Sequence, residues 1–437
     1  MQDVRKILII GGGESGVGAA VLAKQKGYQV FLTDSGEISL NLQKELTKHE
    51  ISYEEKGHNI EKLDNYDLII KSPGVPRTAS LLVKAIEMDV PVWSEIEFGF
   101  RFCDSKIIGI TGSNGKTTTT ALTYHLLKNA GVKVAIGGNY GIGFCRLLSE
   151  VGKWDWIVLE LSSFQLEDLD SFRPDIAVLL NITEDHLDRY DYDILKYGSA
   201  KLNIVENQER DDTFIYNAED PITKILLKDR KLKMNTIEVS YDNYGNGIYS
   251  KELHTYFDIK LYGKHNLFNA FCAISIARIM GVTDQQIGLG LKIFKNVPHR
   301  LEKVVSIDQV AFVNDSKATN VDAVYYALEG LGSSIIWIAG GTDKGNDYSK
   351  LMPIVGEKVK ALICLGIDNK KLKSTFNNKI EAIYETREMT EAVKLAYDLS
   401  KSGDTILLSP ACASFDLFKN YIDRGNQFKE AVWKLLK

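Results

Sequence analysis

A glycine-rich turn that follows a short apolar run has the residue types and spacing of a phosphate-binding loop. The run is Ile107-Ile-Gly-Ile-Thr-Gly-Ser-Asn-Gly-Lys-Thr-Thr118. Gly112 and Gly115 let successive backbone N–H groups turn toward polyphosphate oxygens. Lys116 supplies a positive charge, and the hydroxyl of Thr117 can bind the Mg²⁺ that accompanies a nucleotide. We therefore expect nucleotide binding at this turn.

The residues after this turn are predicted to form a helix over 118–128, whose positive N-terminal end would face the same phosphates. The loop departs from the strict eight-residue P-loop pattern, because Ile110 stands six positions before the lysine where that pattern has glycine. An ordinary strand-to-helix turn that carries glycines is therefore the alternative.

Two further polar residues lie where apolar runs end, which is where α/β sheets bind ligands. Glu160 closes the run 156–161, and His186 follows the strand predicted over 176–180. A carboxylate and an imidazole at adjacent strand ends can share a divalent cation with a nucleotide, although each alone is more often a capping or solvated residue. Lys201 lies in a helical pattern, and from the residue pattern alone we expect it to be solvated.

The first block of the chain carries a second glycine fingerprint. Gly11-x-Gly13-x-x-Gly16 follows a predicted strand, and Asp34 comes about twenty residues later, as in dinucleotide-binding folds. Alone, this pattern suggests a nicotinamide dehydrogenase. The better phosphate loop at 112–117 and the lack of a hydride-transfer constellation weaken that interpretation. We expect a nucleotide-sugar or other diphosphate to bind here, with a structural glycine turn as the alternative.

The length and the order of predicted elements indicate an α/β protein with about three domains. Strands alternate with helices in all three blocks, so we expect parallel sheets throughout. We expect a Rossmann-like N-terminal domain, a central P-loop-type ATPase domain and a Rossmann-like C-terminal domain. Their predicted bounds are 1–93, 94–298 and 299–437.

Composition narrows the classes of function. A formal net charge of −5 provides no general basic surface, so nucleic acid is not the expected partner. The N-terminus lacks a signal-peptide core, and no apolar run reaches membrane-spanning length, so we expect a cytoplasmic protein without membrane insertion. The cysteines form no C-x-x-C pair, which disfavours a disulfide framework and a thiolate metal site. They are Cys103, Cys145, Cys272, Cys364 and Cys412.

Seven segments, in their order along the chain, resemble the motifs of the Mur ligases. These are the ATP-dependent enzymes that add amino acids to peptidoglycan precursors. The resemblance covers essentially the whole chain, and its last two segments point to the member that adds D-glutamate. The segments are Thr111-Gly-Ser-Asn-Gly-Lys-Thr-Thr118, Glu160-Leu-Ser-Ser-Phe-Gln165, Asn181-Ile-Thr-Glu-Asp-His186, Gly263-Lys-His-Asn266, Pro298-His-Arg300, Asp315-Ser-Lys-Ala-Thr-Asn320 and Ser409-Pro-Ala-Cys-Ala-Ser414.

The resemblance implies a reaction. The terminal carboxylate of UDP-N-acetylmuramoyl-L-alanine attacks the γ-phosphorus of ATP to give an acyl phosphate, and the amine of D-glutamate then displaces phosphate to form the amide. It further implies two Mg²⁺ ions, a carbamylated lysine and a cytoplasmic enzyme of peptidoglycan precursor synthesis, which we expect to be a monomer. A nicotinamide oxidoreductase and a non-catalytic nucleotide-binding scaffold are the alternatives.

The resemblance also implies site residues for ATP and the metals. Arg300 would bind phosphate, Asp315 the ribose, and two asparagines would lie around adenine. The full ATP set is Gly112, Ser113, Asn114, Gly115, Lys116, Thr117, Thr118, Asn266, Asn269, Arg300, Asp315 and Lys317. The metal ligands would be Thr117 and Glu160 on one Mg²⁺, His186 on a second, and Lys201 as a carbamate. Lys116, Glu160, His186 and the modified Lys201 would be the catalytic residues.

For the other two substrates, the resemblance implies sites in the first and third domains. Glu14 and Ser15 are not the residues typical of the uridine site, and Cys412 is interpreted as a small packing residue because no base is implied beside it. The UDP-sugar set is Ser15, Asp34, Ser72, Pro73, Gly74 and Asn139. The D-glutamate set is Thr319, Lys344, Ser414 and the backbone of Tyr421.

Overall fold

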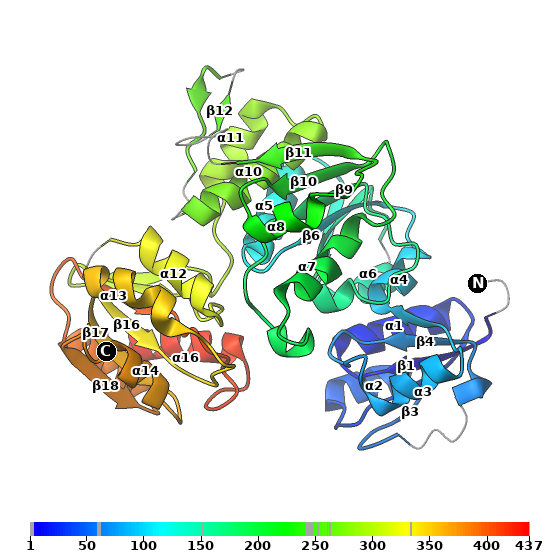
Figure 1. Cartoon of the computed structure of the whole chain (residues 1–437), viewed down its shortest axis with the longest axis horizontal. Helices are drawn as coiled ribbons and strands as arrows, with labels where there is room; N and C mark the ends of the chain where they lie inside the picture. The colour runs from blue at the N-terminus through cyan, green and yellow to red at the C-terminus, as the bar shows by residue number, and fades with distance from the viewer. Residues whose placement is uncertain are drawn as a thin grey trace. The chain divides into compact units, whose positions relative to one another are not determined.

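The computed structural model contains three large β-sheets, and Figure 1 colours the chain from blue at the N-terminus to red at the C-terminus. It describes residues 4–58, 63–150, 152–240, 248–250, 253–259, 261, 264–332 and 334–436, so Gly263 of the predicted motif lies outside the described residues. The chain divides into two compact units. One comprises Met1–Phe257 and Asn269–Leu291, and the other comprises Asp258–Phe268 and Lys292–Lys437. The predicted domain bounds at 93 and 298 stay a proposal.

The N-terminal sheet is parallel, with strand order β3-β2-β1-β4-β5. Because the chain reverses its direction of progress between β1 and β4, their carboxyl ends open a crevice where open α/β sheets bind ligands. The strands are β1 (Lys6–Ile10), β2 (Gln29–Thr33), β3 (Ser52–Glu54), β4 (Leu68–Lys71) and β5 (Val92–Ser94). The helices are α1 (Glu14–Gln25), α2 (Leu40–Lys48) and α3 (Ser80–Glu87), and η1 (Leu63–Asn65) is a short 3₁₀ turn.

The central sheet is also parallel, with strand order β11-β10-β9-β6-β8-β7. Strand β6 lies between β8 and β9, so the carboxyl ends of these three strands meet at one edge. The strands are β6 (Lys106–Thr111), β7 (Val134–Gly138), β8 (Trp156–Glu160), β9 (Ile176–Leu179), β10 (Thr213–Asn217) and β11 (Asn235–Val239). The helices are α4 (Glu95–Phe100), α5 (Lys116–Asn129), α6 (Phe144–Ser149), α7 (Ile194–Leu202), α8 (Pro221–Leu227), α10 (Lys264–Ile279) and α11 (Asp284–Ile293). The 3₁₀ turns are η2 (Ser163–Gln165), η3 (Leu187–Arg189) and η4 (Asn203–Val205).

The second unit has a sheet with strand order β14-β15-β19-β16-β17-β18. Alternate residues of its central strands enter two different cores, as Trp337 and Ile336 do on β16, so both faces of the sheet are buried. The strands are β14 (Glu302–Ile307), β15 (Val310–Asn314), β16 (Ile335–Ala339), β17 (Val359–Leu365), β18 (Ala382–Thr386) and β19 (Thr405–Leu408). The helical elements are α12 (Val321–Gly330), η5 (Tyr348–Leu351), α13 (Met352–Lys358), α14 (Lys370–Phe376), α15 (Met389–Asp398) and α16 (Tyr421–Lys434).

The prediction of parallel sheets throughout is wrong at two places. Strand β14 pairs antiparallel with β15, and β12 (Tyr249–Ser250) forms a small antiparallel pair with β13 (Thr255–Tyr256). Only Asp308 and Gln309 connect β14 to β15, and both have positive φ, 49° and 63°. Such a two-residue turn closes a hairpin, whereas a parallel pair needs a crossover of a dozen residues or more.

Within the part of the chain that the structure describes, no helix is long and apolar enough to cross a membrane. All five cysteines lie among the described residues and carry no disulfide there.

Candidate active site

The glycine-rich turn connects β6 to α5 as the sequence predicts, and its backbone requires glycine. Gly115 has a φ of 85°, and a Cβ built there would lie 2.2 Å from the side-chain oxygen of Asn269 on α10. Gly112 has a φ of 152°, and its Cβ would lie 2.9 Å from Cβ of Leu180. Helix α5 begins at Lys116, two residues before the predicted start, because the left-handed Gly115 already caps it. The turn therefore presents the N-terminal end of α5 to a ligand.

Residues that follow β9 hold this turn in place. The backbone N–H of Ser113 donates to the carbonyl of Asn181 at 2.9 Å, and the N–H of Asn114 donates to the side-chain oxygen of Asn181 at 2.9 Å. The hydroxyl of Ser113 donates to the carbonyl of Thr183, and the N–H of Thr183 donates back to that hydroxyl, each at 2.9 Å. Asn181 and Thr183 belong to one of the seven segments that resemble Mur ligase motifs, but their residue types predict no role for them. The structure assigns them the role of bracing the loop.

Two lysine ammonium groups converge on the carbonyl of Gly112. Nζ of Lys116 donates to the carbonyls of Gly112 and Ser113 at 2.8 Å, and Nζ of Lys201 donates to Gly112 at 2.8 Å. Lys201 is only 1% exposed, so the expectation of a solvated lysine is wrong. Burial, together with the charge of Lys116, lowers the pKa of Lys201 well below the ordinary lysine value, against the opposing charge of Asp185.

The strand ends beside the loop carry the predicted carboxylate. Glu160 is buried at the end of β8, and Nδ2 of Asn139 donates to its Oε1 at 2.7 Å. The backbone N–H of Asn139 also donates to the carbonyl of Glu160 at 2.8 Å. Thr117 is buried in the first turn of α5. One predicted metal ligand therefore orients the predicted UDP-sugar residue Asn139.

His186 has a left-handed backbone, with φ of 52°, and caps the 3₁₀ turn η3. Its side chain is 39% exposed, and its ring packs edge-on against Phe164 with 5.1 Å between ring centroids. Among the described residues, no group of three or more His, Cys, Asp or Glu side chains gathers as a metal site. The predicted site needs only Glu160 and His186 of these types, with the hydroxyl of Thr117 and a carbamate on Lys201, and it stays a prediction.

In the N-terminal sheet, the predicted diphosphate residues lie at the β1/β4 crevice. The N–H of Gly12 donates to Oδ2 of Asp34 at 2.5 Å, and the hydroxyl of Ser72 donates to the carbonyl of Gly11 at 3.0 Å. Helix α1 begins at Glu14, whose carboxylate lies 3.0 Å from Nη2 of Arg146 on α6. The structure thus brings Asp34, Ser72 and the start of α1 to one glycine turn.

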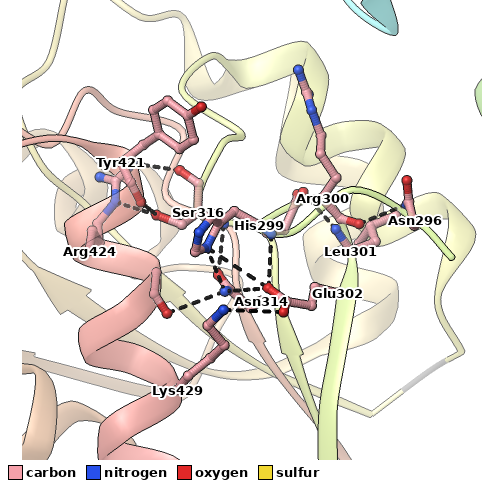
Figure 2. A network of polar contacts seen from close by, with 12 residues as sticks. Asn296, His299, Arg300, Leu301, Glu302, Asn314, Ser316, Tyr421, Arg424 and Lys429 are labelled. Atoms are coloured by element: carbon pink, nitrogen blue, oxygen red, sulfur yellow. Dashed lines mark hydrogen bonds and ion pairs between the residues drawn. The ribbon is translucent and has the colours of Figure 1, made fainter. Parts of the chain in front are cut away.

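In the second unit, Asp315 follows β15 and is buried. Its Oδ1 accepts from the N–H of Leu301 at 3.1 Å, and its Oδ2 accepts from the hydroxyl of Ser409 at 2.9 Å. Burial raises the pKa of Asp315 to about 7, and the nearby charge of Arg300 opposes that rise. In Figure 2 the Arg300 side chain extends away from the polar network around Asn314.

Of the four residues predicted for D-glutamate, three follow neighbouring strands of the second unit and one begins a helix. Thr319 follows β15, Lys344 follows β16, Ser414 follows β19, and Tyr421 is the first residue of α16. The carbonyl of Tyr421 accepts from the hydroxyl of Ser316 at 2.8 Å. These segments leave the same edge of the sheet, because β15, β19 and β16 are parallel neighbours.

Cys412 lies between these segments and is a packing residue. Its thiol is buried, which raises its pKa to about 11, and Sγ lies 3.0 Å from the hydroxyl of Tyr348. A thiol with a raised pKa is a poor nucleophile at neutral pH. The environment of Cys412 therefore agrees with the interpretation drawn from sequence.

Comparison with known proteins decides the family. Residues 6–81 match the MurD N-terminal domain, residues 110–277 the Mur ligase middle domain, and residues 299–412 the Mur ligase glutamate ligase domain. A curated protein of Christiangramia forsetii is 48% identical over 99% of this chain and 100% of its own length. The chain belongs to the Mur ligase family.

Other Mur ligases agree with this assignment. The relative from Cytophaga hutchinsonii is 46% identical over 99% of both chains, and like the first it is named UDP-N-acetylmuramoylalanine–D-glutamate ligase. The crystal structure of the UDP-N-acetylmuramate–alanine ligase MurC from Thermotoga maritima has a TM-score of 0.62, 22% identity, and covers 99% of this chain and 100% of its own. That likeness supports the fold, so the chain has the three α/β domains of a Mur ligase.

Proposed function

We infer that this Mur ligase joins D-glutamate to UDP-N-acetylmuramoyl-L-alanine at the expense of ATP. The observation that carries this inference is the end-to-end identity of 48% to a protein named for that reaction. The phosphate loop and the strand-end residues described above supply the local chemistry. The chain is thus an ATP-dependent, amide-forming ligase of peptidoglycan precursor synthesis.

A carboxylate and an amine do not condense unaided in water, so the carboxylate needs a better leaving group. Its oxygen attacks the γ-phosphorus of ATP, the bond to ADP breaks, and an acyl phosphate forms. The amine nitrogen of D-glutamate then forms a bond to the acyl carbon, the bond from that carbon to phosphate breaks, and the amine loses a proton. The protein's main tasks are to align two anions and to neutralise their repulsion.

The geometry of the phosphate loop supports ATP binding there. Lys116 rests on two carbonyls of its own loop and can turn toward the β- and γ-phosphates. Asn181 and Thr183 keep the loop N–H groups oriented, so little order has to be imposed during the reaction. When bound, Mg²⁺ neutralises phosphate charge, and Thr117 and Glu160 are the oxygen donors that suit it. The ATP residues predicted from the resemblance are proposed on this basis.

We further propose that Lys201 is carbamylated and that two Mg²⁺ ions bind, with His186 at the second. Carbon dioxide adds to a neutral amine and releases a proton, and the buried amine of Lys201 has a lowered pKa that favours the neutral form. The carbamate would place an anion beside the ammonium of Lys116, so the charge that disfavours a protonated Lys201 would attract the modified side chain.

The substrate sites in the outer domains are proposed at the residues predicted above. Ser15, Asp34, Ser72, Pro73, Gly74 and Asn139 would bind the UDP-sugar, and Thr319, Lys344, Ser414 and the backbone of Tyr421 would bind D-glutamate. Support for the second set comes from the parallel strand ends that carry it. The cytoplasmic location and the monomeric state stay predictions.

Phosphate release tests this proposal. Release should require ATP, UDP-N-acetylmuramoyl-L-alanine and an amino acid together, and D-glutamate should be by far the best acceptor. D-Glutamine should be poor, because the groups that pair with the second carboxylate would be left without a charged partner. Comparable rates with L-alanine, L-lysine or meso-diaminopimelate would assign the chain to a different Mur ligase reaction.

A further inference from the structure

Arg424 on α16 is a fully buried cation that connects three separate loops. Its Nε donates to the hydroxyl of Ser316 at 3.0 Å, and its Nη2 donates to the carbonyl of Ser316 at 2.8 Å. Its Nη1 donates to the carbonyls of Cys412 at 3.1 Å and Gly340 at 3.4 Å. The side chain is 1% exposed. Figure 2 draws it beside Ser316 and Tyr421.

Each contact of Arg424 lies just before a residue proposed for D-glutamate. Ser316 precedes Thr319 by three positions, Gly340 precedes Lys344 by four, and Cys412 precedes Ser414 by two. On its own helix, Arg424 lies three positions after Tyr421, whose carbonyl accepts from the hydroxyl of Ser316. One guanidinium group therefore contacts or adjoins all four segments.

We propose that Arg424 is a positioning residue for D-glutamate, which sets the mutual spacing of these four segments and acts through them. This inference rests on the proposed D-glutamate site. The planar guanidinium suits the role, because its five donors have fixed directions and can hold several carbonyls at set angles. The single ammonium of a lysine cannot reproduce that geometry.

The electrostatics argue against a role in packing alone. Among the described contacts, the hydrogen-bond acceptors of Arg424 are carbonyls and a hydroxyl, and no carboxylate is bonded to it. Burying a cation that bonds to no carboxylate is costly, and the nearby charge of Asp416 offsets that cost only in part. An apolar side chain would fill the same space at lower cost. Burial lowers the pKa of Arg424 to about 10, so the group stays charged at neutral pH. Its positive charge also favours a ligand with two carboxylates nearby.

The same helix provides matched controls. Lys429 lies five positions later on α16, and its Nζ is 3.3 Å from Oε1 of Glu302, in the neighbouring network of Figure 2. Lys429→Met removes a cation from α16 without touching the three loops. Phe428→Leu reduces the apolar packing of the same helix, because Phe428 is buried in the core.

The test compares Arg424→Lys and Arg424→Met with these two controls. For each variant, KM for the three substrates and kcat are measured by phosphate release, and stability by urea unfolding. We expect KM for D-glutamate to rise about thirtyfold in both Arg424 variants, as for loss of several charge-assisted hydrogen bonds. KM for the UDP-sugar should change less than about threefold, because Arg424 contacts no residue of that proposed site. Both controls should keep the wild-type KM for D-glutamate.

Several outcomes would overturn the proposal. One is an unchanged KM for D-glutamate in the Arg424 variants, and another is an equal rise in KM for all three substrates. A third is a wild-type KM for D-glutamate in Arg424→Lys, because the positive charge alone would then be sufficient. If Arg424→Met does not fold, Arg424→Lys carries the test. Failure of the proposed function is distinguishable, because the wild-type enzyme itself would then not use D-glutamate.

Discussion

The two ends of α5 allow a controlled test of the phosphate loop. Gly115 and Gly131 have nearly the same φ, 85° and 86°, and they flank the same helix. An alanine at Gly131 would meet no heavy atom within 4 Å, whereas its Cβ at Gly115 would lie 2.2 Å from Oδ1 of Asn269. Both substitutions, Gly115→Ala and Gly131→Ala, therefore strain the backbone in the same way. Only the alanine at position 115 also clashes with Asn269.

The magnitudes follow from this geometry. A left-handed backbone costs an alanine about 1–2 kcal/mol, which both variants should lose from the free energy of unfolding. At Gly115 the buried amide of Asn269 must also move by roughly 1 Å, because an ordinary contact is about 3.4 Å. Displacing a buried polar group from its partners costs about 1–3 kcal/mol more. Binding of ATP is affected separately, because Asn269 is proposed to contact the adenine. Loss of a contact worth about 1–3 kcal/mol would raise KM for ATP by about 5- to 150-fold.

Urea unfolding and ATP-dependent kinetics of both variants provide the readout. Gly131→Ala should be slightly destabilised with an unchanged KM for ATP, and Gly115→Ala should show the larger loss in both measurements. If the two variants have the same KM for ATP, the approach of Asn269 to the loop has no part in nucleotide binding.

Three further predictions concern charged groups. Lys116→Ala should lower kcat by a factor of about 100 or more in a folded protein, because its charge acts on phosphates in the transition state, and near-normal turnover would remove this loop from catalysis. Lys201→Ala should lose most activity and recover part of it with added short carboxylates, whereas full activity without them would contradict carbamylation. Burial raises the pKa of Glu95 from 4.5 to about 7, so the folded state binds the proton more tightly than the unfolded state. Between pH 4.5 and 7 the free energy of unfolding of the wild type should therefore fall by about 3 kcal/mol more than that of Glu95→Gln, which keeps the contribution of Asp315, and parallel pH profiles of the two proteins would refute this account.

The phosphate loop could be predicted from the sequence because the residues that indicate it are close together in the chain. Glycines, a lysine and a threonine stand between a strand pattern and a helix pattern, and the structure places β6 and α5 on either side. The start of α5 was misplaced because the predicted boundary ignored that Gly115 can cap a helix in the left-handed conformation. The antiparallel β14–β15 edge was missed because the rule of strand–helix alternation overrode the short Asp308–Gln309 connection.

The burial of Lys201 could not be predicted from its residue pattern. On α7 it shares a buried face with Tyr197 and Gly198, but which face of a helix is buried depends on the elements packed against it. The bracing by Asn181 and the loop connections of Arg424 were missed for a related reason. Ser316 lies 108 positions from Arg424, and Asn181 lies 67 positions from Asn114, so only the folded chain brings these groups together.

The most direct test of the central claim follows oxygen from substrate to product. UDP-N-acetylmuramoyl-L-alanine is labelled with ¹⁸O in its terminal carboxylate and incubated with ATP, Mg²⁺ and D-glutamate, and the phosphate and the amide are analysed by mass spectrometry. The account predicts one ¹⁸O atom in each phosphate released and one D-glutamate in each amide formed. Unlabelled phosphate, or phosphate released without an amide to D-glutamate, would contradict it.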